Sequence, residues 1–241
     1  GVTGVTADNI DAINSAVAQL VSTSKDSTAE VQGIFDAYDA VLAAADGTAA
    51  NATALPTAAQ YTALGVTGLT GSTATASANM LGNLIDGLTR ADVDTVAELQ
   101  TLADAASAIV GAASGGIVTL AQLQALGITG ATADNLAAIQ TAMAATADDG
   151  SAVDSLAEVQ ALVTQAAAIF ILSNYDGTNT TPTTGDYTAA AVTGVTSANL
   201  GAINSALAGL MGQPLPALWG GHHLNALFMS AATPQHWREM L

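Results

Sequence analysis

Three glutamates recur along the chain in the same local sequence and are the first candidates for acid–base chemistry. Glu30, Glu98 and Glu158 each follow an alanine and precede an aliphatic residue and a glutamine. Glycoside hydrolysis needs two carboxyl groups that converge on one sugar. Each of these glutamates instead stands three residues after a serine or threonine, which is the spacing of a capping box at a helix N-terminus. We interpret them as capping residues, and no paired-acid catalytic site is predicted.

The residues that other catalytic or metal sites require are missing or poorly placed. The chain has no cysteine, and its histidines are His222, His223 and His236. Adjacent histidines rarely share one zinc ion, and no third ligand stands at a recognisable spacing. There is no Gly-x-Ser-x-Gly turn, and the pair Gly115-Gly116 has no lysine beside it to hold a phosphate. The sequence predicts that the chain is not an enzyme and has no cofactor.

Calcium is the one ion that the composition leaves open. Loop oxygens at Asp46, Asp176 and Asn179 are of the kind that calcium prefers, and the chain has 20 acidic residues in all. It has neither an EF-hand loop nor glycine-rich nonapeptides. The sequence therefore predicts a chain without a bound metal, and calcium binding is the alternative.

The overall composition excludes several classes of partner. Of 241 residues, 50% are hydrophobic and only 10% are charged, yet the net charge is −17 because 20 acidic residues oppose 3 basic ones. Disordered chains combine high charge with low hydrophobicity, so this chain is expected to fold. Lys25, Arg90 and Arg238 are too few to bind nucleic acid or an anionic membrane surface. The most apolar stretch, residues 159–172, is too short for a membrane span and is predicted to be a buried helix.

Internal repeats organise the chain. The run Val2-Thr3-Gly4-Val5-Thr6 returns in similar form at 66–70, 128–132 and 192–196, with spacings of 64, 62 and 64 residues. A second run, Ala-Glu-(Val or Leu)-Gln, occurs at 29–32, 97–100 and 157–160. A third begins at Pro56-Thr57 and has counterparts at 119–123 and 182–187. Because three kinds of run recur in the same order, the sequence indicates three repeats of about 63 residues and the start of a fourth.

Each repeat contains three helix starts. Capping boxes are predicted at Ser27/Glu30, Thr95/Glu98, Ser155/Glu158, Thr57/Gln60, Thr119/Gln122 and Thr183/Asp186. Further N-caps are predicted at Thr6, Thr132 and Thr196, and left-handed C-terminal glycines at Gly65 and Gly127. Apolar residues such as Ile10, Ile13, Val17 and Leu20 follow helical spacing. We expect helices of about 14, about 18 and about 8 residues in each repeat.

The predicted fold is all-α, with tandem three-helix repeats stacked into an elongated array. The repeats occupy residues 1–65, 66–127 and 128–191, and residues 192–210 start the fourth. The second repeat carries about four extra residues near 71–77. Because the chain begins with Gly1 rather than methionine, we expect a fragment or a processed form of a longer protein.

The tail, residues 211–241, departs from the repeat and is the most aromatic part of the chain. Its candidate interaction residues are Trp219, Leu224, Leu227, Phe228 and Trp237. One interpretation is a cap on the open end of the stack, which repeat arrays need for solubility. The alternatives are a segment that docks on a partner or on another copy, and an artificial junction or truncated reading frame.

Residues 61–68 (Tyr-Thr-Ala-Leu-Gly-Val-Thr-Gly) and 192–200 (Val-Thr-Gly-Val-Thr-Ser-Ala-Asn-Leu) resemble helical repeats of large secreted bacterial surface proteins. Those proteins are biofilm-associated and RTX-like adhesins. The resemblance covers about residues 1–210 and implies an extracellular stalk or spacer at the bacterial cell surface, without catalytic residues. It also implies export into surroundings that contain calcium, although the RTX nonapeptides are missing.

An acidic, cysteine-free helical array also suits an extracellular role when judged from composition alone. The alternative is a self-assembling subunit of a filament or surface layer, because open repeat ends can stack head-to-tail. In either case the expected partners are neighbouring repeats or other copies, and the ligand at the cell surface or in the matrix is not identified.

Overall fold

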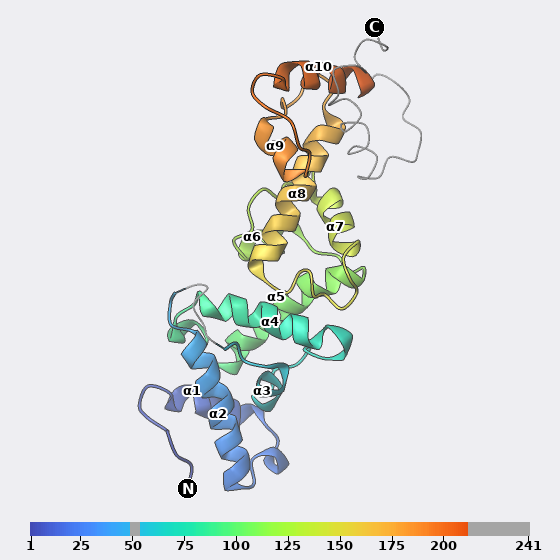
Figure 1. The fold of residues 1–241 in the computed structure, drawn as a ribbon. Helices are drawn as coiled ribbons and strands as arrows, with labels where there is room; N and C mark the ends of the chain where they lie inside the picture. The colour runs from blue at the N-terminus through green and yellow to red at the C-terminus, as the bar shows by residue number, and fades with distance from the viewer. Residues whose placement is uncertain (49–53, 212–241) are drawn as a thin grey trace. The chain divides into compact units, whose positions relative to one another are not determined.

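The computed structural model describes residues 1–48 and 54–211 and is helical throughout that part of the chain (Figure 1). Its one extended pairing there is an isolated antiparallel bridge between Asp46 and Thr89. The predicted all-α class is therefore confirmed for the described residues. The stacking of three-helix repeats and the repeat boundaries stay predictions. The five candidate interaction residues of the tail lie outside the described residues.

Ten α-helices follow one another along the described chain (Figure 1). Their bounds are α1 Ile10–Gln19, α2 Thr28–Ala44, α3 Ala58–Ala63, α4 Ala74–Asp86, α5 Val96–Gly111, α6 Leu120–Ala125, α7 Leu136–Ala144, α8 Leu156–Asn174, α9 Thr184–Ala189 and α10 Leu200–Met211. Four 3-10 turns lie between them at Ser22–Ser24, Gly71–Thr73, Arg90–Asp92 and Ala112–Ser114.

Local sequence explains where the long and short helices begin. Complete capping boxes form at the starts of α2, α3, α5, α6 and α9. At the start of α8, the Ser155 hydroxyl donates to Glu158 Oε2 at 2.9 Å and accepts the Glu158 N–H at 3.3 Å. The predicted left-handed glycines are also confirmed, with φ of +88° at Gly65 and +74° at Gly127.

The remaining helices begin later than predicted. Regular α-helix starts at Ile10, Leu136 and Leu200 rather than directly after Thr6, Thr132 and Thr196. An asparagine three residues after each threonine forms a turn at this point. Asn9 Oδ1 accepts the Thr6 N–H at 2.8 Å, and Asn9 Nδ2 donates to the Gly4 carbonyl at 3.2 Å. The side-chain amide thus holds a turn before the first regular helical residue, and α1 has 10 residues instead of about 14.

The chain divides into two compact units. The first comprises residues 1–129 and 140–160, and the second comprises residues 130–139 and those from 161 onward. Within the first unit, α2 packs against α1, α3 and α4, and α5 packs against α1 and α4. Its fully buried side chains include Tyr38, Tyr61, Leu64, Met80, Leu81, Ile85, Leu99 and Ile109. Burial of such residues contributes roughly 1.5–3 kcal/mol for each large aliphatic side chain.

The second unit has a smaller core around α9 and α10. Its buried residues are Leu172, Tyr175, Tyr187, Val192 and Leu207. The ring of Tyr187 is fully buried, and its hydroxyl reaches the buried side chain of Asn204 on α10. This hydrogen bond fixes α9 against α10.

Candidate interaction site

A hydrogen-bonded clamp joins the start of the chain to α2. The side-chain amide of Gln32 accepts the Thr3 N–H at 2.8 Å and donates to the Thr3 carbonyl at 3.3 Å. The Thr3 hydroxyl also donates to Gln32 Oε1 at 3.3 Å. Gln32 in turn donates to Asp36 Oδ1, one turn further along α2, at 2.9 Å. The amide therefore satisfies both backbone groups of one extended residue, as a neighbouring strand would.

The same clamp occurs twice more among the described residues. Thr67 N–H donates to Gln100 Oε1 at 2.8 Å, and Thr129 N–H donates to Gln160 Oε1 at 2.9 Å. The return bonds from Nε2 to the threonine carbonyls measure 3.2 and 3.0 Å. Each clamp therefore joins two of the recurring runs that the sequence places about 30 residues apart. Their recurrence was visible in the sequence, but their pairing was not.

The recurring glutamates act as helix caps. Glu30 Oε2 accepts the N–H groups of Asp26 and Ser27 at 3.1 and 3.0 Å and the Ser27 hydroxyl at 2.9 Å. The hydrogen bonds from Ser27 and Asp26 hold the pKa of Glu30 below its usual value. These contacts stabilise the ionised form of Glu30, as expected of a capping carboxylate.

The aspartates that precede these caps are perturbed in the opposite direction. Hydrogen bonding and charge repulsion from Glu30 raise the pKa of Asp26. Desolvation is the main cause of the raised pKa values of Asp94 and Asp154, and neighbouring glutamates add to it. Asp154 is the most enclosed of the three and accepts a hydrogen bond from Asn79 Nδ2 at 2.7 Å. Each aspartate lies beside the capping glutamate of its own helix, and that glutamate contributes to each raised pKa.

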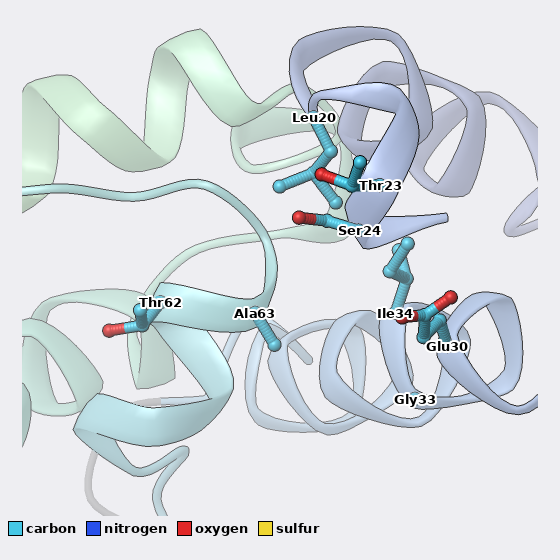
Figure 2. A pocket seen from close by; sticks show the side chains of 8 residues that line it. All are labelled: Leu20, Thr23, Ser24, Glu30, Gly33, Ile34, Thr62 and Ala63. Carbon is cyan, nitrogen blue, oxygen red and sulfur yellow. The ribbon is translucent and has the colours of Figure 1, made fainter. Parts of the chain in front are cut away.

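A hollow of about 370 Å³ lies between the α1–α2 connection, α2 and α3 (Figure 2). Figure 2 shows Leu20, Thr23 and Ser24 from the connection, Ile34 from α2, and Ala63 from α3 around a common space. Glu30, Gly33 and Thr62 complete the lining. The single ionisable group of the lining, Glu30, is already occupied by its cap. The hollow thus offers hydroxyl groups and apolar surface but no acid–base pair.

The predicted calcium-type oxygens take part in turns. Asp46 Oδ1 accepts the Thr48 N–H at 2.8 Å, and Asp176 Oδ1 accepts the N–H groups of Thr178 and Asn179 at 2.8 and 3.2 Å. These bonds lower the pKa of Asp176. Within residues 1–48 and 54–211, no three His, Asp or Glu side chains come together in a way that could hold a metal ion. Calcium binding stays an untested alternative.

α8 is less enclosed than the sequence suggested. Over an 18-residue window its mean hydropathy is 1.6, and 28% of that window is buried. By length and composition alone this helix could cross a membrane, as could the core helix of many soluble proteins. In its first turns, Gln160 clamps Thr129.

The fourth recurring threonine, Thr193, differs from the other three. No glutamine among the described residues contacts it, and its backbone N–H and carbonyl make no hydrogen bond there. The asparagine turn that follows is nonetheless intact, because Asn199 Oδ1 accepts the Thr196 N–H at 2.7 Å and Asn199 Nδ2 donates to the Gly194 carbonyl at 2.9 Å. The segment is thus shaped like its three counterparts but has no clamp.

Comparison of the chain with family models, with curated proteins and with solved structures gave no match.

Proposed function

We propose that this chain is a structural spacer: tandem three-helix repeats of about 63 residues that form part of the extracellular stalk of a bacterial surface adhesin. On this account the repeats stack into an elongated array. The chain has no catalytic role, and its partners are adjacent repeats.

The observation that carries the proposal is the recurrence of the threonine–glutamine clamp. The same atoms pair at Thr3/Gln32, Thr67/Gln100 and Thr129/Gln160, with N–H···Oε1 distances that differ by only 0.1 Å. A catalytic or ligand site needs unlike residues that converge at one place. Repetition of one structural contact at regular spacing instead favours a modular chain whose units perform the same mechanical task.

Charge and chemistry support the same function. A net charge of −17 keeps acidic arrays apart in solution, which suits an exposed stalk. The recurring glutamates are occupied as helix caps, and the hollow beside Glu30 has no second ionisable group. These features favour a spacer over an enzyme.

Sedimentation velocity with light scattering tests the proposal. The chain is expected to sediment as an elongated monomer over a hundredfold range of concentration, both with calcium and with a chelator. Polymers that grow with concentration would contradict the spacer and favour the self-assembling subunit. A compact globular monomer would contradict both.

A further inference from the structure

α1 and α10 carry matching residues at matching positions but bury them differently. On α1 and just before it, these residues are buried: Asn9 is 8% exposed, Ala12 2%, Ile13 4% and Ala16 0%. The residues 190 positions later are Asn199, Ala202, Ile203 and Ala206. Ala202 is exposed and the other three are only half-buried. α1 packs against α2 and α5 in the first unit, so this face of α10 matches a face that neighbouring helices cover in the first repeat.

The segment before α10 shows the same difference. Thr193 has no clamp in the described part of the chain, whereas Thr3 is held by Gln32. The backbone groups of Thr3 that Gln32 binds therefore have no matching glutamine partner at Thr193 in the described part of the chain.

We infer that the Thr193 edge and the Ala202/Ile203 face of α10 form a docking site for one more helix of the α2 type. This inference rests on the proposed repeat architecture. The partner helix would begin with Ser/Thr-x-x-Glu and carry glutamine two residues after the glutamate. Its side-chain amide would accept the Thr193 N–H and donate to the Thr193 carbonyl.

The occupant is a separate helix of this chemistry rather than a second copy of the chain. Gln32, Gln100 and Gln160 each already clamp a threonine of their own chain, so a second copy would have to break one clamp to form another. The sequence after residue 211 contains no glutamate followed by an aliphatic residue and glutamine. The tail therefore does not encode this helix.

The probe is a fluorescent peptide of residues 24–46, made helical by a hydrocarbon staple between positions 39 and 43, which are exposed on α2. Fluorescence anisotropy against the full chain is expected to show saturable binding at one site. A peptide with Gln32→Met should bind about fivefold more weakly, since it lacks the clamp.

Two chain variants locate the site. Ala202→Arg places a long charged side chain on the docking face and should weaken binding at least about tenfold. Ala198→Arg is the matched control, because position 198 and its counterparts Asp8 and Asp134 are all exposed. It should leave binding unchanged, and circular dichroism should show both variants folded.

Absence of saturable binding by the stapled peptide overturns the inference, and so does binding that Ala202→Arg leaves intact. Neither result touches the spacer function, which stands or falls with sedimentation. If the full chain polymerises without peptide and Ala202→Arg stops it, the occupant is a second copy, and the inference of a separate helix is wrong.

Discussion

The hydroxyl of Tyr187 donates a hydrogen bond of 2.7 Å to Asn204 Oδ1 inside the core of the second unit. Asn204 Nδ2 then donates to the Pro182 carbonyl at 2.9 Å, so each buried polar group has a partner. Tyr61 follows Pro56 as Tyr187 follows Pro182, and it is also fully buried. Its hydroxyl has no hydrogen-bond partner among the described residues.

Replacing each tyrosine by phenylalanine should therefore have opposite effects. Tyr187→Phe leaves Asn204 Oδ1 short of a donor and should lower the free energy of unfolding by about 1–3 kcal/mol. Tyr61→Phe removes an unsatisfied hydroxyl and should be neutral or stabilising by up to about 1 kcal/mol. Urea denaturation of the two variants measures both values. Equal losses would mean that the Tyr61 hydroxyl has a partner in solution.

A left-handed alanine offers a second matched pair. Gly127 and Ala191 each follow a short helix, with φ of +74° and +60°. Gly127→Ala should cost about 1 kcal/mol from backbone strain alone, because no atom lies within 4 Å of the new Cβ position. Ala191→Gly should gain a few tenths of a kcal/mol, since relief of strain exceeds the added flexibility of the unfolded chain. Thermal unfolding of both variants measures these changes. A lower stability of Ala191→Gly would show that residue 191 does not adopt the left-handed conformation.

The clamps should each contribute modestly to stability. Gln100→Met keeps the apolar stem but removes the three hydrogen bonds with Thr67, and should cost about 0.5–1.5 kcal/mol because the site is solvent-exposed. Hydrogen exchange gives the specific readout: the Thr67 amide should exchange faster in the variant, while the Thr129 amide keeps its rate. In the unmodified chain the Thr193 amide should exchange fastest of the four. Equal protection of the Thr193 and Thr67 amides from exchange would contradict the conclusion that Thr67 is clamped and Thr193 is not.

Asp154 should make the stability depend on pH. Desolvation raises its pKa, so the folded chain binds the proton more tightly than the unfolded chain does. The protonated form of Asp154 therefore favours the folded chain at low pH. This stabilisation is lost as pH rises from the ordinary aspartate pKa near 4 through the raised pKa of the folded state, and the loss is complete at neutral pH. Asp154→Asn should raise Tm at pH 7, and the gain in the free energy of unfolding should be below about 1 kcal/mol because the group is only partly buried. The substitution should change nothing at about pH 3.

Asp149→Asn is the control of opposite sign. Hydrogen bonds from Ser151 lower the pKa of Asp149, so its stabilisation is present above the ordinary aspartate pKa and is lost as pH falls. This variant should lower Tm at pH 7. The Tm changes of Asp154→Asn and Asp149→Asn at pH 7 should therefore have opposite signs. Changes of the same sign would contradict the assignment of desolvation at Asp154 and hydrogen bonding at Asp149.

Local chemistry made much of this fold predictable from the sequence. A capping box needs only two residues three positions apart, so every predicted box could be found without knowledge of the tertiary structure. Regular helix in α1, α7 and α10 begins later than the sequence predicts, after a turn in which an asparagine binds the N–H of the predicted N-cap threonine, and such a turn has no periodic signal.

Contacts between distant segments were less predictable. The glutamine of each clamp was part of a recognised recurring run, but nothing local indicates that its partner is a threonine about 30 residues earlier. The unsatisfied Tyr61 hydroxyl goes with a difference in residue type between the repeats. Tyr187 and Asn204 are 17 positions apart, and once the four extra residues of the second repeat are allowed for, Gly82 stands at the position equivalent to Asn204. Such a loss becomes visible only when the repeats are compared atom by atom.

Small-angle X-ray scattering tests the central claim, that like helical units stack end to end, most directly. A chain ending at residue 211 should be measured so that the tail contributes nothing. A compact globule of that length would have a radius of gyration of about 17 Å, whereas units of about 63 residues in a linear stack give roughly 25–30 Å and a rod-like intermediate region. The account predicts the larger value. A radius of gyration near 17 Å with a globular profile would contradict it.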